Sequence, residues 1–231
     1  CKPLFCNTTG ECNVAIGHCA SYCTLSGTGA IAIGEEALKT TTGQGNTIAI
    51  GAQALKSLTT GSGNMAIGAC AMRDTTTGLS NLAIGVQALK YTTDGRYNVG
   101  IGTNAVGNNT SGCYNTGVGY LASLKNTTAC RNTSLGACAL YNTTGGCNIS
   151  IGYGSLFTNV TGANNVAVGM EALVSNNACN NTAVGTYALR YNITGCKNVA
   201  VGSSALKSNT TGVCNTILGF EAGICNTTGA A

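Results

Sequence analysis

A glycine that follows a short apolar run recurs in thirteen copies along the chain, with steps of 17 residues or, twice, 16. A period this short holds one strand, a corner and a turn, and it is too short for the helix pairs of solenoids with about 33–34 residues per repeat. The repeat therefore constrains the fold more strongly than any other feature. The marker glycines are Gly17, Gly34, Gly51, Gly68, Gly85, Gly102, Gly119, Gly136, Gly152, Gly169, Gly185, Gly202 and Gly219.

Positions within a repeat are counted from the marker glycine, which is position 0. Position −1 is always Ile, Val or Leu, position +3 is Ala in twelve copies, and position +4 is usually Leu. The pattern N-[VIT]-A-[IV]-G-x-x-A-L, followed by Thr-Thr-Gly, predicts five extended residues, a corner, a short Ala-Leu segment and a turn. We expect an all-β fold, a parallel β-solenoid (β-roll) of about 13 coils with 16–17 residues per coil, stacked roughly 4.8 Å apart.

The predicted strand is apolar on both faces. Positions −3 and −1 carry Val, Ile or Leu, and positions −2 and 0 carry Ala or Gly on the opposite face. A strand that is apolar on both faces is buried on both. The coil interior covers one face and a second copy of the chain is the simplest cover for the other, so the pattern predicts a homo-oligomer. A thicker monomeric coil that encloses both rows is the alternative.

Identical residues at one position are expected to stack into ladders. Asn occupies position −4 in eleven copies, and stacked amides can hydrogen-bond to one another along the stack. We assign these asparagines a structural rather than a catalytic role. The predicted ladder residues include Gly34, Gly51, Gly68, Gly85 and Gly102 together with Asn64, Asn81, Asn98 and Asn115.

The N-terminal residues 1–23 depart most from the repeat and are rich in cysteine. They are predicted to form a cap, which doubles as the first coil, or a socket for the next subunit. Residues 24–231 are predicted to form a single continuous repeat array. An uncovered end of stacked strands is a template for further pairing, and head-to-tail contacts that do not close generate filaments.

Fourteen cysteines, no CxxC motif and one histidine favour disulfides over metal binding, and hence an extracellular, cell-surface or virion-surface location. Cysteines at one position of neighbouring coils have Cα atoms about 4.8 Å apart, which suits a disulfide. Buried free thiols are the alternative. The candidate pairs are Cys6–Cys23, Cys113–Cys130, Cys179–Cys196 and Cys1–Cys19.

Asn-x-Ser/Thr sequons fall in the polar loop of many copies, where an attached glycan is expected to face solvent. The alternative is that Asn-Thr-Thr-Gly is simply favourable turn sequence, because earlier copies have Thr in the same loop. The candidate acceptors are Asn109, Asn126, Asn142, Asn159, Asn192, Asn209 and Asn226.

The charged residues are few, 8% of the chain, and they exclude several functions. No run of Lys and Arg indicates nucleic-acid binding, no apolar stretch is long enough to span a membrane, and no catalytic or cofactor motif is present. We therefore predict a non-enzymatic protein without cofactors. Lys39, Lys56, Arg73 and Lys90 share position +5, and this basic row is either a solvated face or a contact for anionic glycans or a membrane surface.

Residues 165–173, N-V-A-V-G-M-E-A-L, and their equivalents in nearly every copy resemble the head repeats of trimeric autotransporter adhesins. They are also similar to the repeat arrays of bacteriophage and viral tail fibres. The resemblance covers about residues 13–229. It implies a left-handed parallel β-roll, commonly trimeric, that displays a surface or serves as a stalk.

Three functions follow from these observations. The first is a structural protomer of an extracellular fibre or filament, and the second is a trimeric adhesin or tail-fibre shaft that binds host-surface glycans. The third is an ice-binding solenoid, which the Thr-rich coils suggest, although the threonines lie in turns rather than in a Thr-x-Thr strand ladder. A trimer and a head-to-tail filament both remain open as the form of self-association.

Overall fold

The computed structural model describes residues 2–24, 26–42 and 45–229, and it divides into two compact units, Cys1–Asn115 and Thr116–Ala231. Within the described residues it has thirteen strands, one per copy of the repeat, and no helix. The predicted all-β class is confirmed. None of the described residues belongs to a helix that is long and apolar enough to cross a membrane.

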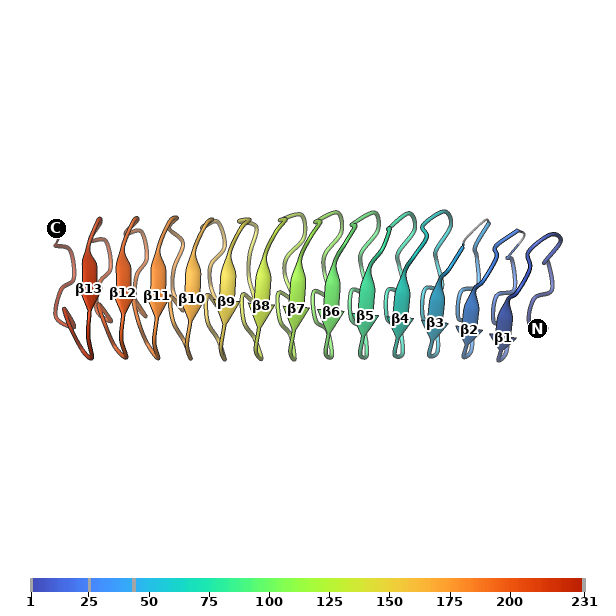
Figure 1. Cartoon of the computed structure of the whole chain (residues 1–231), viewed down its shortest axis with the longest axis horizontal. Helices are drawn as coiled ribbons and strands as arrows, with labels where there is room; N and C mark the ends of the chain where they lie inside the picture. The colour runs from blue at the N-terminus through green and yellow to red at the C-terminus, as the bar shows by residue number, and fades with distance from the viewer. Residues whose placement is uncertain (1, 25, 43–44, 230–231) are drawn as a thin grey trace. The chain divides into compact units, whose positions relative to one another are not determined.

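The strands are three residues long and follow one another in chain order within each unit (Figure 1). The first unit contains β1 (Val14–Ile16), β2 (Ile31–Ile33), β3 (Ile48–Ile50), β4 (Met65–Ile67), β5 (Leu82–Ile84) and β6 (Val99–Ile101). The second unit contains β7 (Thr116–Val118), β8 (Thr133–Leu135), β9 (Ile149–Ile151), β10 (Val166–Val168), β11 (Thr182–Val184), β12 (Val199–Val201) and β13 (Thr216–Leu218).

Neighbouring strands pair in parallel, and equivalent positions of the repeat lie opposite each other. Ala32 pairs with Ala49, and Ile33 pairs with Ile50, one repeat further along. Each unit is therefore a parallel β-solenoid in which one repeat makes one coil, as the sequence predicted. The left-handed winding that the resemblance implies stays a prediction.

The core of each unit consists of alanines at positions −2 and +3 and of a row of larger residues, mostly Leu, at position +4. In the third repeat these residues are Ala49, Ala54 and Leu55, which are fully buried. Leu140, Leu156 and most of their equivalents form the same row in the second unit. The interior is narrow because alanine is the main side chain on two of its walls, which explains why the chain needs almost no large aromatic core residues.

Each strand is three residues long and ends one residue before its marker glycine, whereas five extended residues were expected. Gly51 has a φ of +130°, a conformation that residues with a side chain rarely adopt. A Cβ atom on Gly51 would lie 2.5 Å from the carbonyl oxygen of Gly68 in the next coil. The repeat therefore requires glycine at this corner. Both constraints recur at Gly17, Gly34, Gly68, Gly85, Gly119, Gly136, Gly152, Gly169, Gly185 and Gly202.

The Ala-Leu segment forms consecutive β-turns rather than a helix. In the third repeat Ala54 N donates to Gly51 O (3.2 Å) and Lys56 N donates to Gln53 O (3.4 Å). Gln53 and Leu55 occupy the third positions of these turns with φ values of 59° and 49°. A type II turn requires a positive φ at this position and normally has Gly or Asn there. The stacked coils thus impose a left-handed conformation on ordinary residues, once at position +2 and once at +4.

The N-terminal residues also bond as a coil. Leu4 N donates to Ala20 O (3.2 Å), just as Ser21 N donates to Ala37 O (2.8 Å) one repeat later. Leu4 also has the positive φ, 52°, that is typical of position +4. Part of the predicted cap, residues 1–23, therefore continues the register of the array, and its role as a separate domain stays a prediction.

Candidate interaction surface

The side chains at positions −3 and −1 of the strands point away from the core. Ile48 and Ile50 of β3 are half-buried, whereas Ala49 between them is fully buried. None of the residues in β1–β6 is charged. The first unit therefore presents a continuous apolar surface, formed by positions −3 and −1 of β1–β6, which we name the outer sheet face.

The equivalent face of the second unit is more polar. Threonine replaces the apolar residue at position −3 in β7, β8, β11 and β13, while position −1 stays apolar throughout. Leu135 and Ile149 remain exposed on this side. In neither unit does the coil enclose these rows, so the alternative of a thicker monomeric coil is wrong.

The asparagines at position −4 form a hydrogen-bonded ladder inside the coils. Asn81 Nδ2 donates to Asn64 Oδ1 (3.2 Å) and to the carbonyl oxygen of Gly95 (2.8 Å), and Asn81 N donates to the same Asn64 Oδ1 (3.0 Å). Asn98 repeats this arrangement on Asn81. Each amide thus joins its own coil to the coils on both sides, and it satisfies polar backbone groups that the strand corner buries.

A second amide ladder runs at position +7, and it contains most of the predicted glycan acceptors. Asn192 Nδ2 donates to Asn176 Oδ1 (2.7 Å) and to Gly195 O (2.8 Å), and Asn209 Nδ2 donates to Asn192 Oδ1 (2.8 Å). The amide nitrogen to which a glycan would be attached is therefore already bonded on two sides. This ladder was missed because the sequon was interpreted as a surface motif.

The expectation that the sequon asparagines face solvent is wrong for five of them. These five side chains are fully buried because position +7 turns inward to close the loop: Asn109, Asn126, Asn159, Asn192 and Asn209. Asn142 and Asn226 are only partly buried, and their glycosylation stays a prediction. The constant phase of the loop asparagine, equivalent to Thr41, Thr75 and Thr92 in the earlier copies, was the available signal that it belongs to the interior.

Two predicted cysteine pairs occupy equivalent positions in neighbouring coils of one unit. Cys23 lies at position +6, and Cys6 stands 17 residues before it, ahead of the first marker glycine; the two thiols are hydrogen-bonded to each other. Burial, followed by the charge and the hydrogen bond of Cys6, raises the pKa of the Cys23 thiol. Cys179 and Cys196 share position −6, where Lys197 N donates to Cys179 O across the two coils (3.4 Å). Both disulfides stay predictions.

The other two pairs do not lie within the described residues of one unit. Cys1 lies outside the described residues, and Cys113 and Cys130 belong to different units. Cys19 is buried, and its sulfur lies 3.9 Å from His18 Nε2. Among the described residues no group of three or more His, Cys, Asp or Glu side chains could hold a metal ion.

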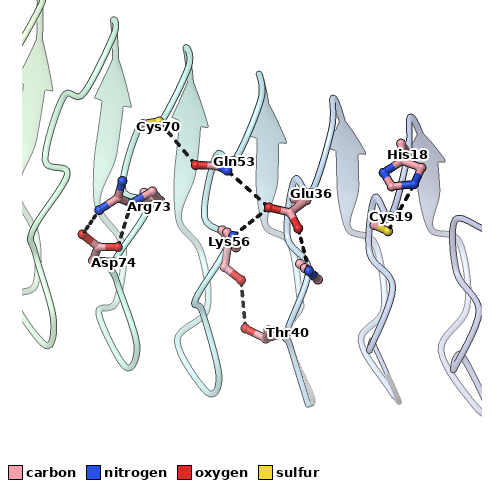
Figure 2. A network of polar contacts seen from close by, with 10 residues as sticks. His18, Cys19, Glu36, Thr40, Gln53, Lys56, Cys70, Arg73 and Asp74 are labelled. Carbon is pink, nitrogen blue, oxygen red and sulfur yellow. Dashed lines mark hydrogen bonds and ion pairs between the residues drawn. The ribbon is translucent and has the colours of Figure 1, made fainter. Parts of the chain in front are cut away.

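Polar side chains at positions +2 and +5 connect the coils of the first unit (Figure 2). Glu36 at +2 accepts from Lys39 Nζ (2.6 Å) in its own coil and from Lys56 Nζ (2.7 Å) in the next. Gln53 Nε2 also donates to Glu36 (3.3 Å). The two lysines lower the pKa of Glu36 from 4.5 to about 2, mainly through their hydrogen bonds.

Replacing Glu36 with glutamine is expected to lower the free energy of unfolding by about 1 kcal/mol at pH 7, since part of the ion pair is solvent-screened. The folded-state pKa is depressed, so the contribution of this carboxylate is complete above about pH 4.5 and is lost as the pH falls towards 2. Urea unfolding of wild type and Glu36→Gln at pH 7 and pH 3 measures the difference. Glu35→Gln, on an exposed neighbour, is the control, and an equal effect of both variants would refute the assignment.

The basic row at position +5 is largely engaged in such contacts. Arg73 makes a two-pronged ion pair with Asp74 (2.8 and 2.9 Å), and Lys90 lies over the ring of Tyr91, 4.6 Å from its centroid. Lys39 and Lys56 share Glu36. Glu36 and Asp74 therefore offset part of the positive charge of this row, whereas the neutral ring of Tyr91 leaves the charge of Lys90 in place.

Threonines at position +8 form a row on the surface, but their hydroxyl groups are used internally. Thr59 Oγ1 donates to Thr76 O (2.9 Å), and Thr76 Oγ1 donates to Thr93 O (3.1 Å). These hydroxyl groups brace the turns of successive coils against each other. They offer less to an ice surface than a row of free hydroxyl groups would.

Comparison with protein-family models, with curated proteins and with solved structures finds no match to the chain. The resemblance to adhesin and tail-fibre repeats therefore stays a prediction.

Proposed function

We propose that the chain is a non-enzymatic structural protomer of an extracellular fibre or filament, and that copies associate through the outer sheet face. The observation that carries this proposal is the uncharged apolar row on the outside of β1–β6. A solvent-exposed apolar sheet of this kind is a site of association, because soluble monomers rarely expose large contiguous apolar patches. Sheets that meet face to face bury such rows between them.

The distribution of the polar groups supports a mechanical rather than a catalytic role. The Asn ladders, the threonine row and the ion pair of Glu36 all connect one coil to the next. Catalysis requires polar groups that converge on a substrate. Here the polar groups instead bond one coil to the next. The extracellular location is proposed from the cysteine content.

The form of self-association is a separate question from its existence. Three copies around one axis would bury the outer sheet faces at the centre of a short shaft, as the adhesin resemblance implies. Copies joined end to end would give long threads. Negative-stain images of the purified protein distinguish these two arrangements by three-fold rods or by threads.

The double variant Ile67→Lys, Ile84→Lys is expected to abolish self-association while leaving the coil folded. Both side chains lie on the outer sheet face, where Ile84 is 36% exposed, and a buried interface would have to desolvate two charges. Light scattering coupled to size-exclusion chromatography should show at least a tenfold loss of assembly relative to wild type, with an unchanged circular dichroism spectrum.

The matched control is the double variant Ala69→Lys, Val86→Lys. It adds the same two charges to the same two coils, but at position +1, where Val86 is 47% exposed and lies beyond the glycine corner. This control should assemble like wild type. The proposal would be refuted by a wild-type protein that stays monomeric at high concentration, or by normal assembly of the Ile67→Lys, Ile84→Lys variant.

A further inference from the structure

A hollow of about 290 Å³ opens on the surface of the second unit at Gly154. Gly154 occupies position +2, where the neighbouring coils carry the side chains of Cys138 and Glu171. A Cβ atom on Gly154 would meet only the Cγ atom of Glu171, at 3.6 Å. The hollow therefore exists because one side chain is missing from an otherwise filled column.

Aromatic rings form the apolar part of this hollow. Phe157 lines it and is held by stacking on Tyr141, with ring centroids 5.0 Å apart and planes inclined by 15°. Tyr153 also lines it and is 58% exposed, so its ring is accessible to a ligand. Val174 completes the apolar lining.

A fixed ion pair forms the polar part of the hollow. Arg190 Nη2 lies 2.5 Å from Glu171 Oε2 in an ion pair, and its guanidinium group is held over the rings of Tyr187 and Tyr191. Within the part of the chain that the structure describes, Arg190 Nε and Glu171 Oε2 are both buried and make no hydrogen bond. A buried donor without an acceptor costs free energy that a bound oxygen atom would recover.

We propose that this hollow binds one ring of a neutral saccharide. A pyranose ring has an apolar C–H face, which suits an aromatic lining, and adjacent hydroxyl groups, which can accept from Arg190 and donate to Glu171. The ion pair is neutral overall, so it selects hydroxyl groups rather than a charged ligand. The volume lies near the lower end of ordinary ligand pockets, about 300 Å³, and fits a single ring rather than a longer chain.

The hollow is separate from the outer sheet face, because its lining comes from positions +1, +2 and +5 rather than from the strands. Saccharide binding therefore does not depend on the fibre role, and either proposal can fail alone. A fibre built from such protomers would repeat this sugar site on every copy of the chain.

Saturation-transfer NMR with glucose, galactose, mannose and N-acetylglucosamine tests the proposal on the full chain. At least one sugar should receive saturation at its ring protons, with a dissociation constant on the order of millimolar, because few atoms are buried. Tyr153→Ala should weaken this binding at least fivefold. Tyr120→Ala, at the same repeat position and 56% exposed, should leave binding unchanged.

Gly154→Gln provides a second, independent variant. Gln53 and Gln87 already occupy position +2 with positive φ, so the coil accommodates glutamine there, and the new side chain should fill the hollow and abolish binding. Ser204→Gln, in the same column but outside the hollow, is its control. Absence of saturation transfer to all four sugars, or wild-type binding by Gly154→Gln, overturns the proposal.

Discussion

Replacing Gly51 with alanine is expected to destabilise the first unit by more than about 4 kcal/mol, which is exceptional for a single methyl group. The new Cβ atom would lie 2.5 Å from the carbonyl oxygen and 2.6 Å from the carbonyl carbon of Gly68. Both are backbone atoms of the next coil, so no side chain can move aside. The φ of +130° adds backbone strain of about 1–3 kcal/mol.

Gly219→Ala separates the two contributions. Gly219 has the same φ, +132°, but a Cβ atom there would meet only the Cβ atom of Ala222, at an ordinary 3.5 Å. This variant should lose only the strain. Chemical denaturation compares the two proteins, and hydrogen exchange should place the faster exchange of Gly51→Ala at β3 and β4. If both variants lose the same free energy of unfolding, the close approach of neighbouring coils at this corner does not contribute to the cost of the Cβ atom.

Replacing Asn81 with leucine is expected to cost about 3–5 kcal/mol, although the two side chains are similar in size. The variant removes the donor to Gly95 O and the acceptor of Asn98 N, and both of those groups are buried. Each buried polar group that loses its partner costs about 1–3 kcal/mol. Urea unfolding measures the loss.

Asn81→Thr is the matched comparison because threonine stands at the same position in the third repeat. Thr47 is fully buried there, and its hydroxyl group donates to Gly45 O (3.3 Å). The threonine variant should therefore lose clearly less stability than Asn81→Leu. If the free energy of unfolding of Asn81→Leu lies within about 1 kcal/mol of the wild-type value, the amide ladder does not hold the coils together.

The phase of the repeat predicted that each strand has two different faces, and the structure shows which of them is buried. Ala49 and Ile50 are both apolar, but only alanine fits a narrow interior, so size separates the buried residue from the outward one. Parallel register then follows, because a one-residue slip would exchange the two rows. The fold was predictable from this phase, whereas the assignment of positions −3 and −1 to the outer sheet face required the structure.

The turns and the hollow were not predictable in the same way. Leu55 has no intrinsic preference for a φ of 49°, and the coil imposes this value because the buried Leu row has to face inward. The hollow at Gly154 depends on the absence of one side chain from a column that forms only after folding. The sequon at Asn192 was misleading for a related reason, since a three-residue motif does not show which way its loop turns.

Two repeats are one residue shorter than the others, and the difference lies at one corner. Asn159 Nδ2 donates to the carbonyl oxygen of Gly162, three residues later, whereas Asn176 Nδ2 donates to that of Ala178, only two residues later. Beyond this corner the register is restored at once. The loop after position +7 can therefore change length without disturbing the coil. Peptides inserted into this loop in successive coils would project from the surface at intervals of about 5 Å, so the protein could present epitopes at a fixed spacing.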